Sequence, residues 1–156
     1  QTVLNDQQKE AFKQFIENGG GFVGIHAATD TEYDWPWYNR LVGAYFAHHP
    51  KPQQLTYHII DKKFPATKGL PDSVSRMEEI YDFKSVQTDS LHFLITADES
   101  TYTGGQMGSF HPAAWYHSFD GGRAFYIAWG HFSEAYNSDA MFQDIVWKGL
   151  KWAMKK

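Results

Sequence analysis

The apolar positions of the chain follow a helical period in three segments. The first segment begins after Asn5, whose side chain can cap a helix, and ends at the run Gly19-Gly20-Gly21. The second begins at Pro36, a favoured residue for the first helical turn. The third runs from Ser138 to the end of the chain and predicts an amphipathic helix. For the second helix we expect an apolar face made of Trp37, Leu41, Val42, Tyr45 and Phe46.

Shorter apolar runs and alternating patterns predict strands in the rest of the chain. The run Phe22-Val23-Gly24-Ile25 is typical of a buried strand that ends at His26. A helix followed directly by a buried strand is half of a β-α-β unit, so we expect an α/β fold with a mostly parallel sheet. Residues 98–110 are polar and are expected to form a long loop. Further strands are expected at 55–60, 77–83 and 91–96, and at 113–118 and 123–129, which flank a hairpin turn, Asp120-Gly121-Gly122.

Composition narrows the class of protein. The length of 156 residues fits one domain, which we expect to span 1–156. A net charge of -4 without a run of Lys or Arg argues against nucleic acid or an anionic membrane as a partner. The chain has no cysteine, which excludes disulfides, thiolate metal sites and a thiol nucleophile. It has eight histidines, and aromatic residues make up 17% of it, so metal, proton-transfer or sugar-binding roles stay open.

Two histidines stand at the ends of predicted strands. His26 follows the apolar run at 22–25, and His131 follows the run at 124–129. Open α/β sheets bind their ligands at the carboxyl ends of strands. Asp30 and Glu134 lie near the two histidines in sequence. Such a set could hold a metal ion or form an acid/base pair, and a satisfied structural histidine is the plainer alternative.

A pair of glutamates lies within the predicted strand at 77–83. Side chains alternate along a strand, so one of Glu78 and Glu79 can face the site while the other faces solvent. A glutamate at such a position is a candidate general base. The alternative is an exposed edge strand with no role in chemistry.

Several other residues are candidates for contacts with a sugar. Trp35 and Trp115 could each cover the apolar face of a sugar ring, although core packing is the more common role of such residues. His48-His49 lies on a predicted loop, where surface histidines are expected. The segment Gly19–Gly24 matches G-x-G-x-x-G by letter. It follows a helix and precedes a strand, the reverse of the dinucleotide-binding order.

Five separated segments of the chain resemble the ThuA-like (trehalose-utilisation) family. They are GGGFVGIHAATDT, WYNRLVGAYFAHHP, EEIYDF, HPAAWYH and GGRAFYIAWGH, in that order. The resemblance covers nearly the whole chain. It implies the flavodoxin-like fold of class I glutamine amidotransferases, a mostly parallel sheet flanked by helices. It also implies that a family member would carry a strand-helix-strand portion ahead of Gln1, so the first strands of the sheet are expected to be missing here.

The resemblance also assigns positions to the candidate site. In the amidotransferases, a cysteine occupies a sharp turn after a strand and a histidine follows a late strand. His26 stands about where that cysteine would be, and His131 about where that histidine would be. Without the nucleophile, release of ammonia from glutamine is excluded. In the family's Asp-Glu-x-Tyr pattern, Glu79 and Tyr81 match and Glu78 departs.

The function implied by the resemblance is carbohydrate metabolism, with trehalose-type or 3-keto-glucoside substrates. A 3-keto group acidifies the proton at C2, so a base could start elimination or isomerisation there. The expected base is His26, Glu79 or His131, and the same three residues could hold a divalent metal ion such as zinc. The substrate contacts expected beside them are Asp30, Trp35, Tyr81, His111 and Trp115.

Two other functional classes remain open at this stage. One is a carbohydrate-binding or accessory module without turnover, and the other is a structural or regulatory amidotransferase-like domain. The expected partner is a small sugar, with neither nucleic acid nor membrane. A homo-oligomer is left open, and so is the compartment, cytoplasm or periplasm.

Overall fold

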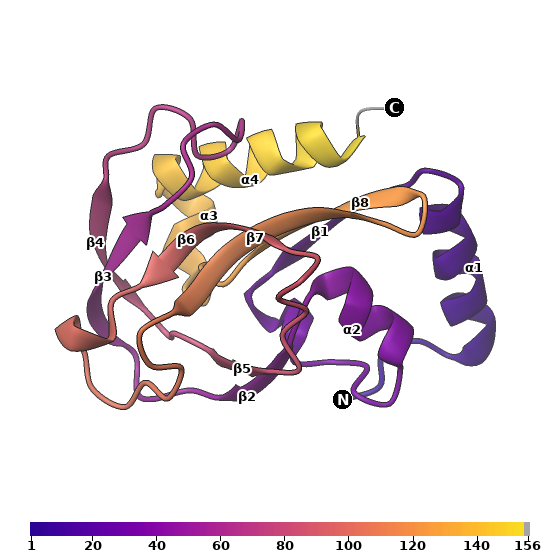
Figure 1. The fold of residues 1–156 in the computed structure, drawn as a ribbon, viewed down its shortest axis with the longest axis horizontal. Helices are drawn as coiled ribbons and strands as arrows, with labels where there is room; N and C mark the ends of the chain where they lie inside the picture. The colour runs from indigo at the N-terminus through magenta and orange to yellow at the C-terminus, as the bar shows by residue number, and fades with distance from the viewer. Residues whose placement is uncertain (155–156) are drawn as a thin grey trace.

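A six-stranded mixed sheet forms the centre of the computed structural model, which describes residues 1–154 (Figure 1). Its strand order is β1-β8-β7-β6-β3-β4, and only β1 and β8 run parallel. The prediction of a mostly parallel sheet is therefore wrong. Strands joined without a helical crossover pair antiparallel, and this chain passes directly from β7 to β8 through a tight turn. The strands are β1 (Gly21–Ile25), β3 (Gln53–Ile59), β4 (Ser73–Glu78), β6 (His92–Ala97), β7 (His111–Phe119) and β8 (Gly122–Ile127).

A second, two-stranded antiparallel sheet was not expected from the sequence. It pairs β2 (Tyr45–His48) with β5 (Asp82–Lys84). The helix that begins at Pro36 ends at Val42, because Gly43 adopts a left-handed conformation with φ 97°. Tyr45 and Phe46 thus belong to β2 and not to the face of that helix. The strand expected over 77–83 is likewise two strands, β4 and β5, separated by residues 79–81.

The helices agree more closely with the sequence pattern. Helix α1 (Asp6–Glu17) begins with a capping box, in which the side chains of Asn5 and Gln8 each bond the other's backbone N–H. Helix α2 spans Pro36–Val42. The expected C-terminal helix is α4 (Ala140–Met154), preceded by the separate short helix α3 (Ser133–Asn137), while residues 155–156 of that prediction lie outside the described chain. Two single 3-10 turns occur at His26–Thr29 and Glu99–Thr101.

Layers on both faces of the large sheet bury its side chains. Helix α4 lies along one face, and α2 with the β2-β5 ribbon lies along the other (Figure 1). Side chains alternate along β7 as expected. Trp115 and His117 donate hydrogen bonds to carbonyl oxygens at the end of α2, whereas Tyr116 packs against Trp152 of α4. The expected hairpin between β7 and β8 is confirmed, with Phe119 paired to Gly122.

No helix in the described part of the chain is long and apolar enough to cross a membrane.

Candidate functional site

His26 lies in a sharp turn directly after β1. Its backbone is left-handed, with φ 43°, a conformation uncommon for a residue with a side chain. Two hydrogen bonds hold the turn, one to strand β8 and one to the residue that follows it. Tyr126 donates its hydroxyl hydrogen to the carbonyl oxygen of His26 at 2.8 Å, and His26 Nδ1 lies 2.8 Å from the carbonyl oxygen of Ala128. The turn therefore fixes the direction of a buried imidazole.

The parallel pairing of β1 with β8 brings the two predicted histidines together. Ile25 is in register with Ile127, so the carboxyl ends of both strands meet at one edge of the sheet. His26 Nε2 and His131 Nδ1 are 3.2 Å apart. Glu79, from the segment between β4 and β5, completes the group, with Oε2 3.3 Å from His26 Nε2 and 3.0 Å from His131 Nδ1. The three residues expected to act together thus lie in mutual contact.

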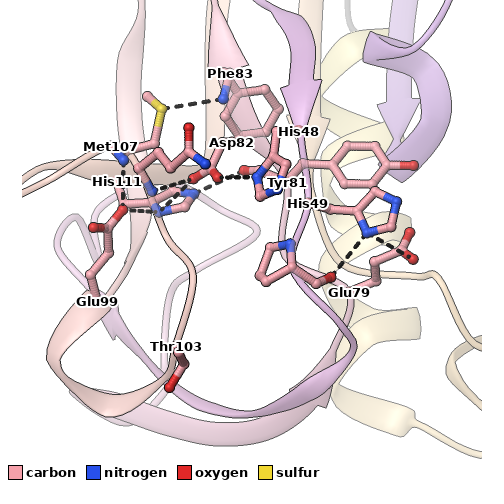
Figure 2. Close-up of polar contacts among 12 residues, drawn as sticks. His48, His49, Glu79, Tyr81, Asp82, Phe83, Glu99, Thr103, Met107 and His111 are labelled. Carbon is pink, nitrogen blue, oxygen red and sulfur yellow. Dashed lines mark hydrogen bonds and ion pairs between the residues drawn. The ribbon is translucent and has the colours of Figure 1, made fainter.

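A third histidine joins this group from the opposite side of Glu79. His49 Nδ1 lies 3.3 Å from Glu79 Oε1 (Figure 2) and 2.9 Å from the carbonyl oxygen of Pro50. The sequence placed His49 on a loop and gave it no role. The only local signal was its position next to His48, and nothing in the chain pattern indicates that this loop folds over Glu79. The four residues His26, His49, Glu79 and His131 are together named the His26 cluster.

The charge balance of the His26 cluster differs from that of the buried glutamates Glu32 and Glu78. Glu32 is paired with Lys9, and Glu78 is paired with Arg76. Glu79, 9% exposed, is instead surrounded by three imidazoles. Imidazoles can gain or lose a proton near neutral pH and can bind metal ions, whereas Lys and Arg hold a fixed charge. The surroundings of Glu79 are therefore suited to chemistry rather than to simple neutralisation.

Tyr81 packs over the cluster. Its ring centroid is 4.1 Å from that of His26 and 4.4 Å from that of Phe46. Burial, and then the charges of Glu79 and Asp30, raise the pKa of Tyr81 to about 12. At neutral pH its hydroxyl is therefore protonated and can donate a hydrogen bond to a ligand.

The carboxylates expected nearby take different positions. Asp30 accepts a hydrogen bond from the hydroxyl of Tyr33 at 2.6 Å. Glu134 is exposed and bonds Ser133. Glu78 was expected to face solvent if Glu79 faced the site, but it is buried, and the guanidinium of Arg76 donates to its Oε1 at 2.7 Å. The strand ends at Glu78, so strict alternation does not continue to Glu79.

The expected tryptophan contacts lie away from the His26 cluster. Trp115 is 1% exposed, donates its indole N–H to the carbonyl oxygen of Val42 and stacks on Tyr126. It offers almost no surface to a ligand. Trp35 stacks on Trp37 at 5.0 Å, on the side of the molecule where α1 packs. His111 is fully buried and belongs to a second group of polar side chains, which lies apart from the His26 cluster.

Comparison with known proteins shows the fold class of this chain. Residues of this chain superpose on a GMP synthase protein from Thermoplasma acidophilum with a TM-score of 0.51, at 11% identity, over 94% of this chain and 68% of that one. The chain therefore has an α/β fold related to that of class I glutamine amidotransferases. A search of the curated proteins gives no match.

The family follows from a match over almost the entire chain. The ThuA family model, described as trehalose utilisation, matches residues 1–153, and the chain belongs to this family. Two ThuA-like crystal structures superpose with TM-scores of 0.80, over 99% of this chain. One is from Parabacteroides merdae, with 22% identity and 69% of its chain covered, and the other from Bacteroides uniformis, with 26% and 66%. The chain thus spans about two thirds of the length of these relatives.

The same fold occurs in a larger carbohydrate-active protein. The carbohydrate deacetylase Agd3 superposes with a TM-score of 0.57 at 17% identity, over 94% of this chain and 21% of that one. At this identity the likeness concerns the fold alone.

Proposed function

We propose that this protein is an enzyme of carbohydrate metabolism that acts on a trehalose-type or 3-keto-glucoside sugar at the His26 cluster. The observation that carries the proposal is the convergence of His26, His131 and Glu79, three groups able to move protons or bind a metal ion, at the carboxyl ends of β1 and β8. Family membership supports the choice of a sugar substrate.

The same three side chains fit a divalent metal ion. His26 Nε2, His131 Nδ1 and Glu79 Oε2 are separated from one another by 3.0–3.3 Å. Adjacent ligand atoms at about 2.0–2.2 Å from one ion lie roughly 2.8–3.1 Å apart in octahedral geometry and roughly 3.3–3.6 Å apart in tetrahedral geometry. Two imidazoles and one carboxylate are a common donor set for zinc and other transition metals. A bound ion would act as a Lewis acid toward a sugar carbonyl oxygen.

His49 is the residue of this cluster best placed to move a proton. The carbonyl oxygen of Pro50 can only accept, so Nδ1 of His49 carries the hydrogen and Nε2 keeps a free lone pair. Its side chain is 41% exposed, so a proton can pass to solvent. In a 3-keto-glucoside this lone pair takes the C2 proton, and the C–H electron pair forms the C2–C3 double bond of an enolate. That pair then either expels the oxygen substituent at C1 or takes up a proton again, which gives elimination or isomerisation.

A cavity of about 480 Å³ is lined by the chain neighbours of two cluster residues. They are Glu78 and Phe132, which precede Glu79 and follow His131, and the lining also includes Arg76 and Asp139 but none of the four cluster residues. This volume lies within the range of small-molecule sites, and its charged lining suits hydroxyl groups.

An NMR time course with a 3-keto-glucoside, with and without a chelator, tests the proposal. New sugar resonances that are lost with chelator support a metal-assisted enzyme, and turnover indifferent to chelator supports acid/base chemistry alone. Line broadening without product would replace the enzyme by a carbohydrate-binding module. No effect on any keto-glucoside would contradict the proposed substrate class.

A further inference from the structure

A second group of polar side chains, separate from the His26 cluster, lies where three elements meet. Asp82 comes from the start of β5, Glu99 from the 3-10 turn after β6, and His111 from the start of β7 (Figure 2). One ligand atom from each of the three lies within 4.8 Å of the others. Asp82 is 3% exposed and His111 is fully buried, so these charges are largely removed from water. This group of three is named the Asp82 cluster.

The hydrogen bonds of His111 determine where its lone pair points. Its Nε2 lies 2.9 Å from the carbonyl oxygen of Tyr81, which can only accept, so Nε2 carries a hydrogen. Its Nδ1 lies 2.9 Å from both Glu99 Oε1 and the hydroxyl oxygen of Tyr102, and 3.8 Å from Asp82 Oδ1. In the neutral imidazole the lone pair of this nitrogen can accept the hydrogen of the Tyr102 hydroxyl. Toward Glu99, however, it faces another lone pair, and that contact needs a proton or a metal ion between the two atoms.

The carboxylates of this cluster have no fixed positive partner among the described residues. Asp82 contacts only imidazoles as potential cations, His48 at 3.0 Å and His111 at 3.8 Å. Glu99 contacts His111. Two carboxylates sharing a mostly buried site repel each other unless a cation lies between them.

Backbone and side-chain donors orient the same ligand atoms. The N–H of Met107 donates to Glu99 Oε1 at 2.7 Å, and the N–H of Gln106 donates to Asp82 Oδ1 at 3.1 Å. Metal-binding imidazoles and carboxylates are typically held by such outer hydrogen bonds, including the bond from His111 Nε2 to a backbone carbonyl. The tautomer and the side-chain directions are thus set before any ion arrives.

One side of the cluster lies close to solvent. A cavity of about 550 Å³ is lined by His48, Gln53, Thr103 and Gln106, together with neighbouring residues of the same two loops, but by none of the three cluster residues. His48 (Figure 2) and Gln106 both contact Asp82. The side chain of Glu99 is 19% exposed, so it is the cluster's own contact with solvent.

We propose that His111 Nδ1, Asp82 and Glu99 form a second cation site, which takes a divalent transition metal ion of the zinc or manganese class. One imidazole with two carboxylates favours such ions over calcium or magnesium, which prefer oxygen ligands alone. Through the bond from His111 to the carbonyl of Tyr81, the ion fixes the segment that carries Glu79 and Tyr81. The role of this ion is positioning, since none of its ligands belongs to the His26 cluster.

Metal content per chain tests this site separately from the first. The protein is stripped with chelator, dialysed against zinc or manganese, and its bound metal measured by mass spectrometry. The variants are Glu99→Gln, Asp82→Asn and a double variant, His26→Ala with His131→Ala. His92→Gln, at an exposed histidine, is the matched control. Circular dichroism checks that each variant is folded.

The outcomes separate the two sites. We expect Glu99→Gln and Asp82→Asn each to lower the bound metal by one ion per chain relative to the unsubstituted protein, with the double variant still retaining the ion that these two lose. If Glu99→Gln and Asp82→Asn keep the full metal content, or if the double variant binds none, the second site does not exist. A chain whose single ion is lost only in Glu99→Gln and Asp82→Asn would support the second site and contradict metal binding at the first.

Discussion

His26 Nδ1 lies 2.8 Å from the carbonyl oxygen of Ala128, a residue 102 positions away along the chain. Because a carbonyl oxygen only accepts, this contact places the hydrogen on Nδ1 and leaves the lone pair on Nε2. Nε2 is the atom that faces His131 and Glu79. One backbone contact thus selects the tautomer that can bind a metal ion or accept a proton, and it depends on the parallel pairing of β1 with β8.

Removal of either imidazole from this site should abolish most of the turnover. We expect His26→Ala and His131→Ala each to lower kcat/KM for a 3-keto-glucoside at least about 100-fold. Each imidazole is either a ligand of the metal ion or a group that moves a proton, and general acid/base groups contribute roughly that much or more. The measurement is the NMR time course, with His92→Ala as a control at an exposed histidine. Unchanged turnover in both variants would mean that the reaction occurs elsewhere.

His49 should affect the rate without affecting metal binding. Its nearest charged partner is Glu79 Oε1, whereas Glu79 Oε2 is the oxygen that faces His26 and His131. We expect His49→Gln to lower kcat about 100-fold and to leave the metal content unchanged, as a general base would. If His49→Gln lowered both kcat and the metal content, His49 would instead be a ligand of the metal ion.

The hydroxyl and the ring of Tyr81 should make separate contributions. Since its pKa is raised to about 12, the phenol stays a donor across the neutral range, and turnover should show no inflection from Tyr81 below about pH 11. Tyr81→Phe keeps the ring stacked on His26 and should lower kcat about tenfold through loss of one hydrogen bond. Tyr81→Ala should lose more, because the imidazole then loses its packing partner. Equal rates for Tyr81→Phe and the unsubstituted protein would remove the hydroxyl from the mechanism.

His117 should make the fold less stable in mild acid. Burial lowers its pKa from 6.5, and although the bond to the Leu41 carbonyl opposes this, the net direction is down. The unfolded chain therefore binds a proton at a higher pH than the folded chain does. The contribution of His117 to the free energy of unfolding is fully present above about pH 6.5. It falls as the pH decreases toward the lowered pKa, by at most about 1.4 kcal/mol per pH unit.

Urea unfolding at several pH values between 7 and 5 measures this effect. His117→Gln can keep a donor for the Leu41 carbonyl without the titration. Its free energy of unfolding should decrease less over this range than that of the unsubstituted protein. If the free energy of unfolding changed with pH in the same way for both proteins, His117 would not be the source of the loss of stability.

Gly149 allows α4 to approach the sheet. A Cβ atom at this position would lie 2.5 Å from Cδ1 of Phe125, a buried residue of β8. We expect Gly149→Ala to lower the free energy of unfolding by about 1–3 kcal/mol, as overpacking of a core does, despite the better helix propensity of alanine. Chemical denaturation measures it, and Trp147→Ala, at an exposed position of the same helix, should change stability much less. A more stable Gly149→Ala would show that the helix can shift at no cost.

The local elements of this protein follow from its sequence. The cap at Asn5, the stop after α1, the strand before His26 and the hairpin at Asp120-Gly121 are all encoded by neighbouring residues. Each depends on backbone bonds or side-chain spacing within a few positions, so the chain pattern alone is sufficient. The strand ends that carry His26 and His131 were identified for the same reason.

The tertiary structure alone decides which strands pair and which side chains meet. The antiparallel order of β6, β3 and β4 and the small β2-β5 sheet depend on loop paths that hydrophobic periodicity does not record. His48 and His49 are exposed, as expected, but their contacts with Asp82 and Glu79 join residues more than 25 positions apart, which no local pattern records. Trp115 was expected to be a ligand platform because a buried ring and an exposed ring share the same local pattern. Sequence thus determined the residue types available for chemistry, and long-range packing determined which of them share a site.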